Sequence, residues 1–171
     1  MNIFTSSEST LQVTILVLPE SSMLVLASMI DPMRAANRLS ERQCFTWKIV
    51  TTDGLPVECT CGLQITPDEK LESINDGNLL FIVSGFKQFE YISNDEIGLI
   101  RRLSLKFDAM GGVDTGAWLL GKAGLLDGKS ATTHWEDLED FADYFRQNKL
   151  RFKYVTVQQR VCYTFSVINS T

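Results

Sequence analysis

The stretch Phe107–Asp137 reads FDAMGGVDTGAWLLGKAGLLDGKSATTHWED and contains the most informative turn of the chain. It opens with a short apolar run, 108–113, that is typical of a buried strand. An acid, Asp114, and a glycine, Gly116, follow, and residues 115–126 then have apolar positions at helical spacing. This order predicts a sharp strand-to-helix turn, which presents one side chain upward beside backbone N–H groups and a helix N-terminus.

Asp114 occupies the position in this turn at which some enzymes carry a serine nucleophile. A carboxylate there is not an acyl-transfer nucleophile. The adjoining N–H groups are expected to lower the pKa of Asp114 and to keep it ionised at neutral pH. Two compatible roles remain open for it: the N-cap of the following helix, and an acceptor for a bound ligand.

The length and composition indicate a single globular domain spanning residues 1–171, with a polar, flexible N-terminus over residues 1–11. Hydrophobic residues make up 44% of the chain and charged residues 22%, which excludes a disordered or fibrous protein. The formal net charge is −5, a poor match for the phosphate backbone of DNA. We therefore expect no DNA binding by these residues alone.

The cysteines, Cys44, Cys59, Cys61 and Cys162, are expected to be reduced thiols. Cys59 and Cys61 are closer in sequence than the usual zinc pair, and His134 is the only histidine, so we expect neither a metal site nor a cofactor. The apolar run Val13–Leu18 is too short to span a membrane. With no targeting signal at the N-terminus, the sequence predicts a cytoplasmic protein without a membrane partner.

Three apolar runs, Val13–Leu18, Phe45–Thr52 and Leu79–Val83, are predicted as buried strands. They alternate with helical patterns, the first of which Pro32 is expected to kink or restart. Further helices are predicted over 94–107, 115–126 and 138–148, and one or two strands over 153–168. This alternation predicts an α/β, three-layer sandwich with a mainly parallel, flavodoxin-like sheet, whose ligands bind beyond the carboxyl ends of the strands.

Four further residues are candidates for the ligand site, each with a structural alternative. His134 would lie over the pocket or serve as a structural hydrogen-bonding residue. Trp118 and Trp135 would form aromatic walls for a cationic group or pack in the core. Gly85 ends a strand, where its backbone would approach a ligand or form a plain turn.

The string GGVDTGAWLLGKAGLLDGKSATTHWEDLEDF, 111–141, resembles the ThiJ/PfpI-like (class I glutamine amidotransferase-like) domain. It is most similar to the version at the N-terminus of AraC-type transcription regulators. The segments ASMIDPMRAANRLS, DGLPVECTCGLQITPD and LLFIVSGF extend the likeness upstream, so that it covers about Val13 to Tyr154. The resemblance implies the same α/β sandwich.

Hydrolytic members of that family carry Cys-His-Gly at the turn. By motif match, Asp114 takes the place of the cysteine and Thr115 that of the histidine, and the acid of the first helix falls at Val25. The resemblance therefore implies no catalytic residues and a non-catalytic domain that senses a small, often nitrogenous metabolite. An ionised Asp114 with an aromatic face from Trp118 or Trp135 would suit an amine, guanidinium or quaternary ammonium ligand. Asp114, Thr115, Gly85, Trp118, His134 and Trp135 are the expected ligand contacts.

The resemblance also implies a homodimer that reaches DNA only through a C-terminal helix-turn-helix domain, of which this chain shows no signal. The alternative is a ThiJ/PfpI-class hydrolase or amidase-like enzyme, against which the residue at position 114 argues. The final strand region departs from the family pattern.

Overall fold

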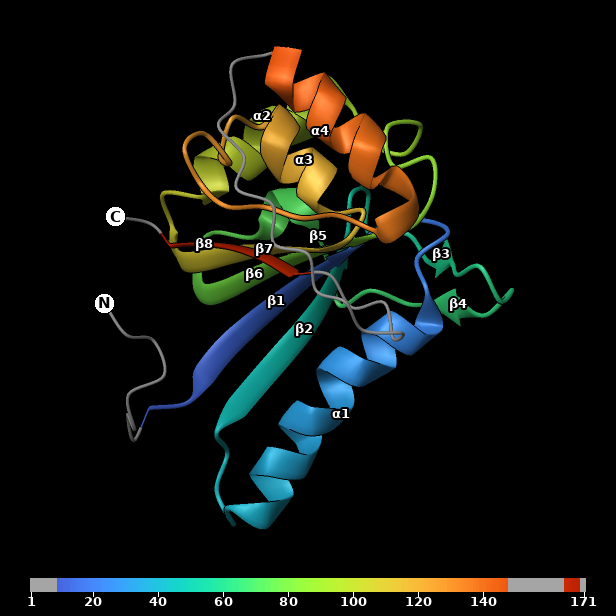
Figure 1. Cartoon of the computed structure of the whole chain (residues 1–171). Helices are drawn as coiled ribbons and strands as arrows, with labels where there is room; N and C mark the ends of the chain where they lie inside the picture. The colour runs from blue at the N-terminus through green and yellow to red at the C-terminus, as the bar shows by residue number, and fades with distance from the viewer. Residues whose placement is uncertain (1–8, 148–164, 170–171) are drawn as a thin grey trace.

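The protein is described by a computed structural model that covers residues 9–147 and 165–169. Its centre is a six-stranded sheet in the order β5-β2-β1-β6-β7-β8 (Figure 1). The strands are β1 (Leu11–Val17), β2 (Phe45–Thr51), β5 (Glu69–Lys70), β6 (Gly77–Ser84), β7 (Phe107–Asp114) and β8 (Phe165–Asn169). All neighbours pair in parallel except β7 and β8, which confirms the mainly parallel sheet.

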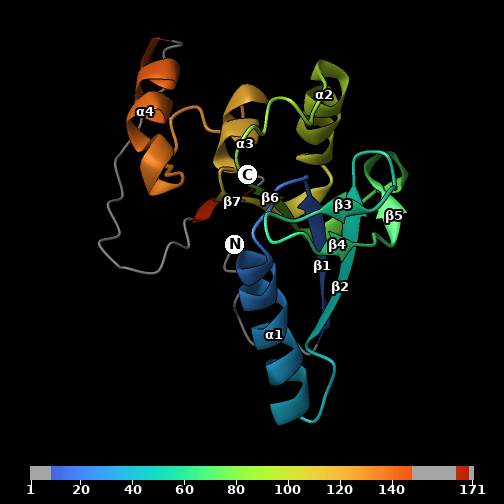
Figure 2. The same ribbon diagram turned by 90° about the vertical axis from the view of Figure 1, so that its right-hand side faces the viewer.

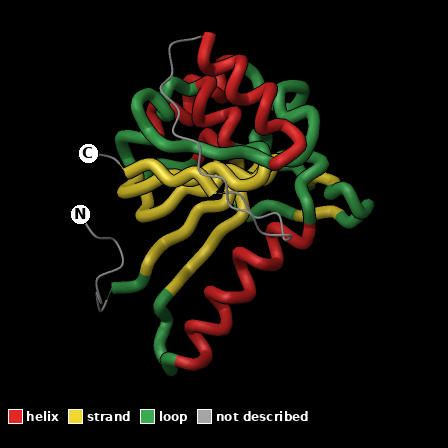
Figure 3. Tube along the Cα trace, viewed as in Figure 1, coloured by secondary structure: helices red, strands yellow, loops and turns green. Residues whose placement is uncertain are grey.

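Helices cover both faces of this sheet, as Figures 2 and 3 show. The helix α1 lies on one face, and α2, α3 and α4 lie together on the other. Their bounds are α1 (Met23–Leu39), α2 (Asn94–Leu103), α3 (Ala117–Lys122) and α4 (Leu138–Gln147). A separate hairpin consists of β3 (Val57–Glu58) and β4 (Gln64–Ile65), and short 3-10 turns are η1 (Leu71–Ser73) and η2 (Trp135–Asp137). The predicted three-layer α/β sandwich is confirmed.

Alternation along β1 explains the three layers. Val13, Ile15 and Val17 belong to a core cluster with α1. Leu16 and Leu18 belong to a second cluster with α2, α3 and α4 on the opposite face. Successive side chains of a strand point to opposite faces, so a continuous apolar run such as this one must be covered by helices on both sides.

Several predicted boundaries differ from the structure. Pro32 lies inside a single helix, α1, and does not restart it. The helix predicted over 94–107 begins at Asn94, where Ser93 caps it in a capping box with Glu96, but it ends at Leu103. The structure ends α3 at Lys122, shortly before Gly124, whose φ is 72°; a glycine in this conformation is a common helix stop.

The acidic segment that follows Pro67 forms β5 and η1. Of the predicted C-terminal strands, only β8 lies within the described residues, and most of the N-terminal segment 1–11 lies outside them. In the part of the chain that is described, no helix has the length and apolar character needed to cross a membrane.

Candidate ligand-binding site

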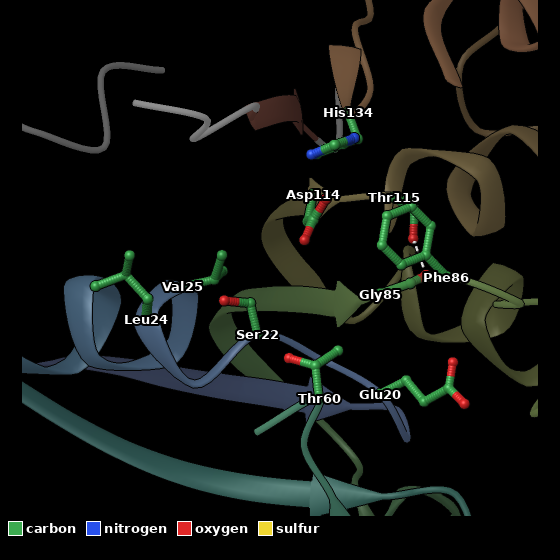
Figure 4. Close-up of a pocket in the computed structure, with 10 residues that line it drawn as sticks. All are labelled: Glu20, Ser22, Leu24, Val25, Thr60, Gly85, Phe86, Asp114, Thr115 and His134. Atoms are coloured by element: carbon green, nitrogen blue, oxygen red, sulfur yellow. Dashed lines mark hydrogen bonds between the residues drawn. The ribbon is translucent and has the colours of Figure 1, made fainter. Parts of the chain in front are cut away.

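A cavity of about 340 Å³ opens at the carboxyl ends of β1, β6 and β7 (Figure 4). It is lined by Glu20, Ser22, Leu24, Val25, Thr60, Gly85, Phe86, Asp114, Thr115 and His134. β1 is flanked by β2 on one side and β6 on the other, so the chain connections diverge here. Parallel α/β sheets bind ligands at such a switch point, which agrees with the location predicted from the sequence.

Asp114 forms the sharp turn that the sequence predicted. Its φ is 60°, in the left-handed region that L-residues other than glycine seldom adopt. The turn is closed by two glycines. A Cβ on Gly116 would overlap the carbonyl oxygen of Ile82, and one on Gly112 would overlap the backbone nitrogen of Ala117. The glycines are required because backbone segments approach each other directly at these points.

The N-cap role predicted for Asp114 is wrong. α3 begins at Ala117, its N-cap is Gly116, and no side chain caps it. The N–H groups beside the carboxylate are already used, since Thr115 donates to the Ser84 carbonyl at 3.3 Å and Gly116 donates to the Val113 carbonyl at 3.0 Å. The turn therefore directs its nearest N–H groups at the backbone rather than at the Asp114 side chain.

The predicted lowering of the Asp114 pKa is also wrong, for a related reason. Burial raises the pKa of Asp114 above its usual value, the charge of His134 acts to lower it, and Asp137 and Glu136 raise it further. Desolvation disfavours the charged form, and the N–H groups that were expected to offset it are occupied. The cavity thus has a half-buried carboxylate that takes up a proton more readily than an exposed aspartate.

Thr115 and Gly85 reach the cavity wall but are engaged with each other. The Thr115 hydroxyl donates to the Gly85 carbonyl at 2.6 Å and is buried. Gly85 also packs directly against the β1–α1 turn, because a Cβ there would overlap the carbonyl oxygen of Glu20. The close backbone approach that was expected of Gly85 is therefore made to the protein itself.

His134 faces Asp114 across the cavity in Figure 4. Its ring packs edge-on against Phe86 with centroids 5.9 Å apart, and its Nδ1 accepts from the backbone N–H of Glu136 at 3.4 Å. The side chain is 16% exposed. His134 therefore combines the two roles considered for it, as a wall of the cavity and as a structural acceptor.

Neither tryptophan lines the cavity. Trp118 is buried among Phe89, Phe141 and Phe145. Its indole Nε1 has no partner within hydrogen-bond geometry among the described residues. Burial raises the pKa of Asp137, and the nearby indole of Trp118 is one of the groups that act against this rise. Trp135 is 64% exposed and stacks loosely beside His134 at 5.8 Å.

The matching family model spans residues 15–164 and describes the DJ-1/PfpI family. The chain belongs to the DJ-1/PfpI family. The model extends over most of the sheet, the turn at Asp114 and the cavity around it. The fold expected from the resemblance is the fold of this family.

Several curated proteins similar to this DJ-1/PfpI chain are transcription regulators. It is 36% identical over 132 residues to the HTH-type transcriptional regulator CdhR of Pseudomonas aeruginosa, covering 77% of this chain and 39% of that protein. It is 32% identical to the regulator GbdR of the same species, covering 76% and 35%. The chain thus spans well under half the length of these regulators.

Two further matches complete the comparison. The crystal structure of an AraC family transcriptional regulator from Pseudomonas putida superposes with a TM-score of 0.68 at 22% identity, over 85% of this chain and 77% of that one. An isonitrile hydratase from Pseudomonas putida is 29% identical and covers 73% of this chain and 53% of that protein. The family therefore includes both regulators and an enzyme.

In this DJ-1/PfpI chain the strand-to-helix turn at Asp114, called here the elbow, lies beside an apolar first helix. Val25 lines the same cavity as Asp114, as the motif match implied. Cys59 is buried and Cys61 exposed on the β3–β4 hairpin, and Cys44 follows α1; none of these three lines the cavity, and Cys162 lies outside the described residues. Within the described ranges no group of three or more metal-binding side chains occurs.

Sequence reasoning missed Glu20, Ser22, Thr60 and Phe86 as lining residues. One feature of the sequence indicates Glu20 as a lining residue. It follows Pro19 directly after a buried strand, at the end of the sheet where such folds bind ligands. The structure adds another. Glu20, Lys87 and Asp114 are three of the four non-glycine residues with positive φ among those described, and strained conformations of this kind gather at functional sites.

Proposed function

We propose that this chain is the non-catalytic, small-molecule sensing and dimerisation domain of an AraC-type transcriptional regulator, with the cavity at Asp114 as its effector site. The observation that carries the proposal is the elbow itself: Asp114 lines the cavity in the strained conformation of a nucleophile turn, and no thiol of the described residues lines it. The resemblance to HTH-type regulators supports a regulatory role for the cavity.

The chemistry of the wall favours a cationic effector, such as an amine or a quaternary ammonium compound. Asp114 contributes a carboxylate, and Phe86 contributes an aromatic face. Burial raises the Asp114 pKa, but a cation bound beside it would favour the ionised form. A bound cation would therefore offset the cost of burying the ionised Asp114 carboxylate.

Calorimetric titration of Asp114→Asn tests this role. We expect a cationic ligand found in a screen of amines to bind the variant about 1.5–3 kcal/mol more weakly, because a hydrogen bond to a charged group is lost. Trp135→Phe is the matched control, since Trp135 does not line the cavity. Equal affinity of wild type and Asp114→Asn would remove Asp114 from the effector site.

Regulators that bind paired DNA half-sites are commonly two-fold symmetric, so we also propose a cytoplasmic homodimer that reaches DNA through a separate C-terminal domain of the full regulator. With a net charge of −5, residues 1–171 should not bind an operator. Sedimentation of the chain at tens of micromolar checks the dimer, and a gel shift at physiological salt checks the lack of DNA binding.

The second candidate, an enzyme, rests on the likeness to an isonitrile hydratase. We expect Asp114→Cys to show no hydrolysis of amides or esters. The Thr115 hydroxyl is committed to the Gly85 carbonyl, Val25 is apolar, and the Nδ1 of His134 already accepts from the Glu136 N–H. A thiolate at position 114 would therefore lack the supporting groups that activate a nucleophile. Appreciable turnover by Asp114→Cys would favour the enzyme.

A further inference from the structure

Glu20 is built into the cavity wall as firmly as Asp114. Its φ is 60°, its backbone N–H donates to the Glu58 carbonyl at 2.8 Å, and Gly85 packs directly on its carbonyl oxygen. A glutamate in this conformation is held by its surroundings and not by its own preference. The backbone therefore fixes the point from which the Glu20 side chain projects.

The Glu20 carboxylate contacts two side chains of the segment 85–93, one by a hydrogen bond and one by an ion pair. This segment joins β6 to α2 and is called here the β6–α2 loop. The Tyr91 hydroxyl donates to Glu20 Oε1 at 3.0 Å, and Lys87 Nζ lies 3.7 Å from the same oxygen. The hydrogen bond to Glu20 is the main cause that raises the pKa of Tyr91. One oxygen of Glu20 thus serves two side chains of the loop.

Two rings of the β6–α2 loop pack against the side of the molecule that holds α3, and Phe86 also lines the cavity. Phe86 packs on His134. Phe89 packs edge-on against Trp118 with centroids 5.6 Å apart, and Lys122 Nζ lies 4.0 Å from the centre of its ring. Lys87 itself has a φ of 61°. The loop is therefore anchored on the α3 side by rings and on the α1 side by Glu20.

Figure 4 shows that the Glu20 carboxylate points away from Asp114 and His134, although its stem lines the cavity. An ammonium and a hydroxyl of the protein already occupy the place that a ligand ammonium would take. The side-chain exposures are 56% for Lys87 and 36% for Glu20, and an exposed pair of this kind is held weakly. A bound cation could displace it.

We propose that Glu20 is a second ligand-binding carboxylate of the cavity, and that Lys87 and Tyr91 are internal competitors for it. This rests on the proposed function of the cavity as a site for a cationic effector. Tyr91 donates a hydrogen bond to Glu20 and Lys87 pairs with it through an ammonium group, so the preferred effector carries a positive charge and N–H donors, as primary and secondary ammonium groups do. Its binding to Glu20 releases the β6–α2 loop from the β1–α1 turn.

The affinity test uses methylammonium as the probe and tetramethylammonium, which has no N–H donor, for comparison. Lys87→Met is expected to bind methylammonium about two- to fivefold more tightly, the range that corresponds to an exposed ion pair. Glu20→Gln is expected to weaken the binding of methylammonium more than that of tetramethylammonium. In the double variant with Lys87→Met and Glu20→Gln, the tighter binding that Lys87→Met gives on its own is expected to be lost. Lys106→Met, an exposed lysine away from the cavity, controls for net charge.

A second readout needs no ligand. Hydrogen exchange of the amides of residues 86–92 is expected to accelerate in Lys87→Met and in Tyr91→Phe, while β7 exchanges as in wild type. Unchanged loop exchange in both variants would overturn the competition.

Failure of the two ideas is distinguishable. One result would support the effector site and overturn the role of Glu20. In that result Asp114→Asn weakens the binding of tetramethylammonium, whereas Glu20→Gln changes the binding of neither tetramethylammonium nor methylammonium. Binding of neither probe to any form would contradict the proposed function, and the role of Glu20 with it.

Discussion

The turns at Glu20 and Asp114 follow two different strands of one parallel sheet and have the same backbone conformation, with φ of 60° at both residues. Their side chains are held in different ways. The Glu20 carboxylate has donors from Tyr91 and Lys87, whereas the main influence on Asp114 is burial. The same strained turn can therefore hold one carboxylate by hydrogen bonds and leave another short of them, and the second is the better prepared to gain from a bound cation.

Backbone packing at both turns gives the largest expected effect. Gly116→Ala and Gly85→Ala are each expected to lower the free energy of unfolding by about 3 kcal/mol, because the new Cβ overlaps a backbone carbonyl oxygen, that of Ile82 or of Glu20. Urea unfolding of the 171-residue chain measures this loss.

The control for these variants is Gly98→Ala inside α2, where a Cβ meets only the far end of Arg102 at 3.6 Å. It is expected to stabilise the chain by about 0.5–1 kcal/mol, since alanine loses less entropy than glycine in a helix. A loss of stability in Gly116→Ala without one in Gly85→Ala would show that only the turn at Asp114 is packed tightly.

Replacing Glu20 or Asp114 with glycine relieves the strain of the left-handed backbone conformation. The resulting changes in the free energy of unfolding should differ between the two turns by a smaller amount. Glycine removes about 1–2 kcal/mol of strain and costs about 0.5–1 kcal/mol of backbone entropy. Asp114→Gly is therefore expected to stabilise the chain by about 1 kcal/mol, because a buried carboxylate is lost as well. Glu20→Gly is expected to change stability by about zero, since the hydrogen bond from Tyr91, worth about 1 kcal/mol, is lost. Thermal unfolding compares them, and equal shifts would mean that the surroundings of the two carboxylates do not differ.

The sequence predicted the sheet and the elbow because both depend on local patterns. Apolar runs marked β1, β2 and β6, and the glycines around Asp114 marked the turn where segments must approach closely. Asp114, Thr115, Gly85 and His134 were predicted as ligand contacts, and the structure places them together in the cavity wall.

What could not be predicted depends on distant parts of the chain. Whether Trp118 faces a cavity or a core is decided by α4, which brings Phe141 and Phe145 against it. The contacts of Glu20 come from a loop about seventy residues later, which holds Tyr91. The pKa of Asp114 was predicted in the wrong direction because the sequence does not show which carbonyl groups already accept from the nearby N–H groups.

The smallest expected effect is the pH dependence of Asp114→Asn, because Asp114 is only partly buried and solvent screens its charge. Burial raises the pKa of Asp114 in the folded state above its value in the unfolded chain. The stabilising contribution of the protonated carboxyl is therefore fully present below a pH of about 3.9, the unfolded pKa, and is lost as the pH rises through the folded pKa. Asparagine does not titrate, so Asp114→Asn should gain stability relative to wild type over that window and keep a constant advantage above it.

Urea unfolding of both proteins between acid and neutral pH measures the difference. A variant that loses stability relative to wild type as the pH rises would mean that the ionised Asp114 is stabilised in the folded protein, as Glu20 is by its donors.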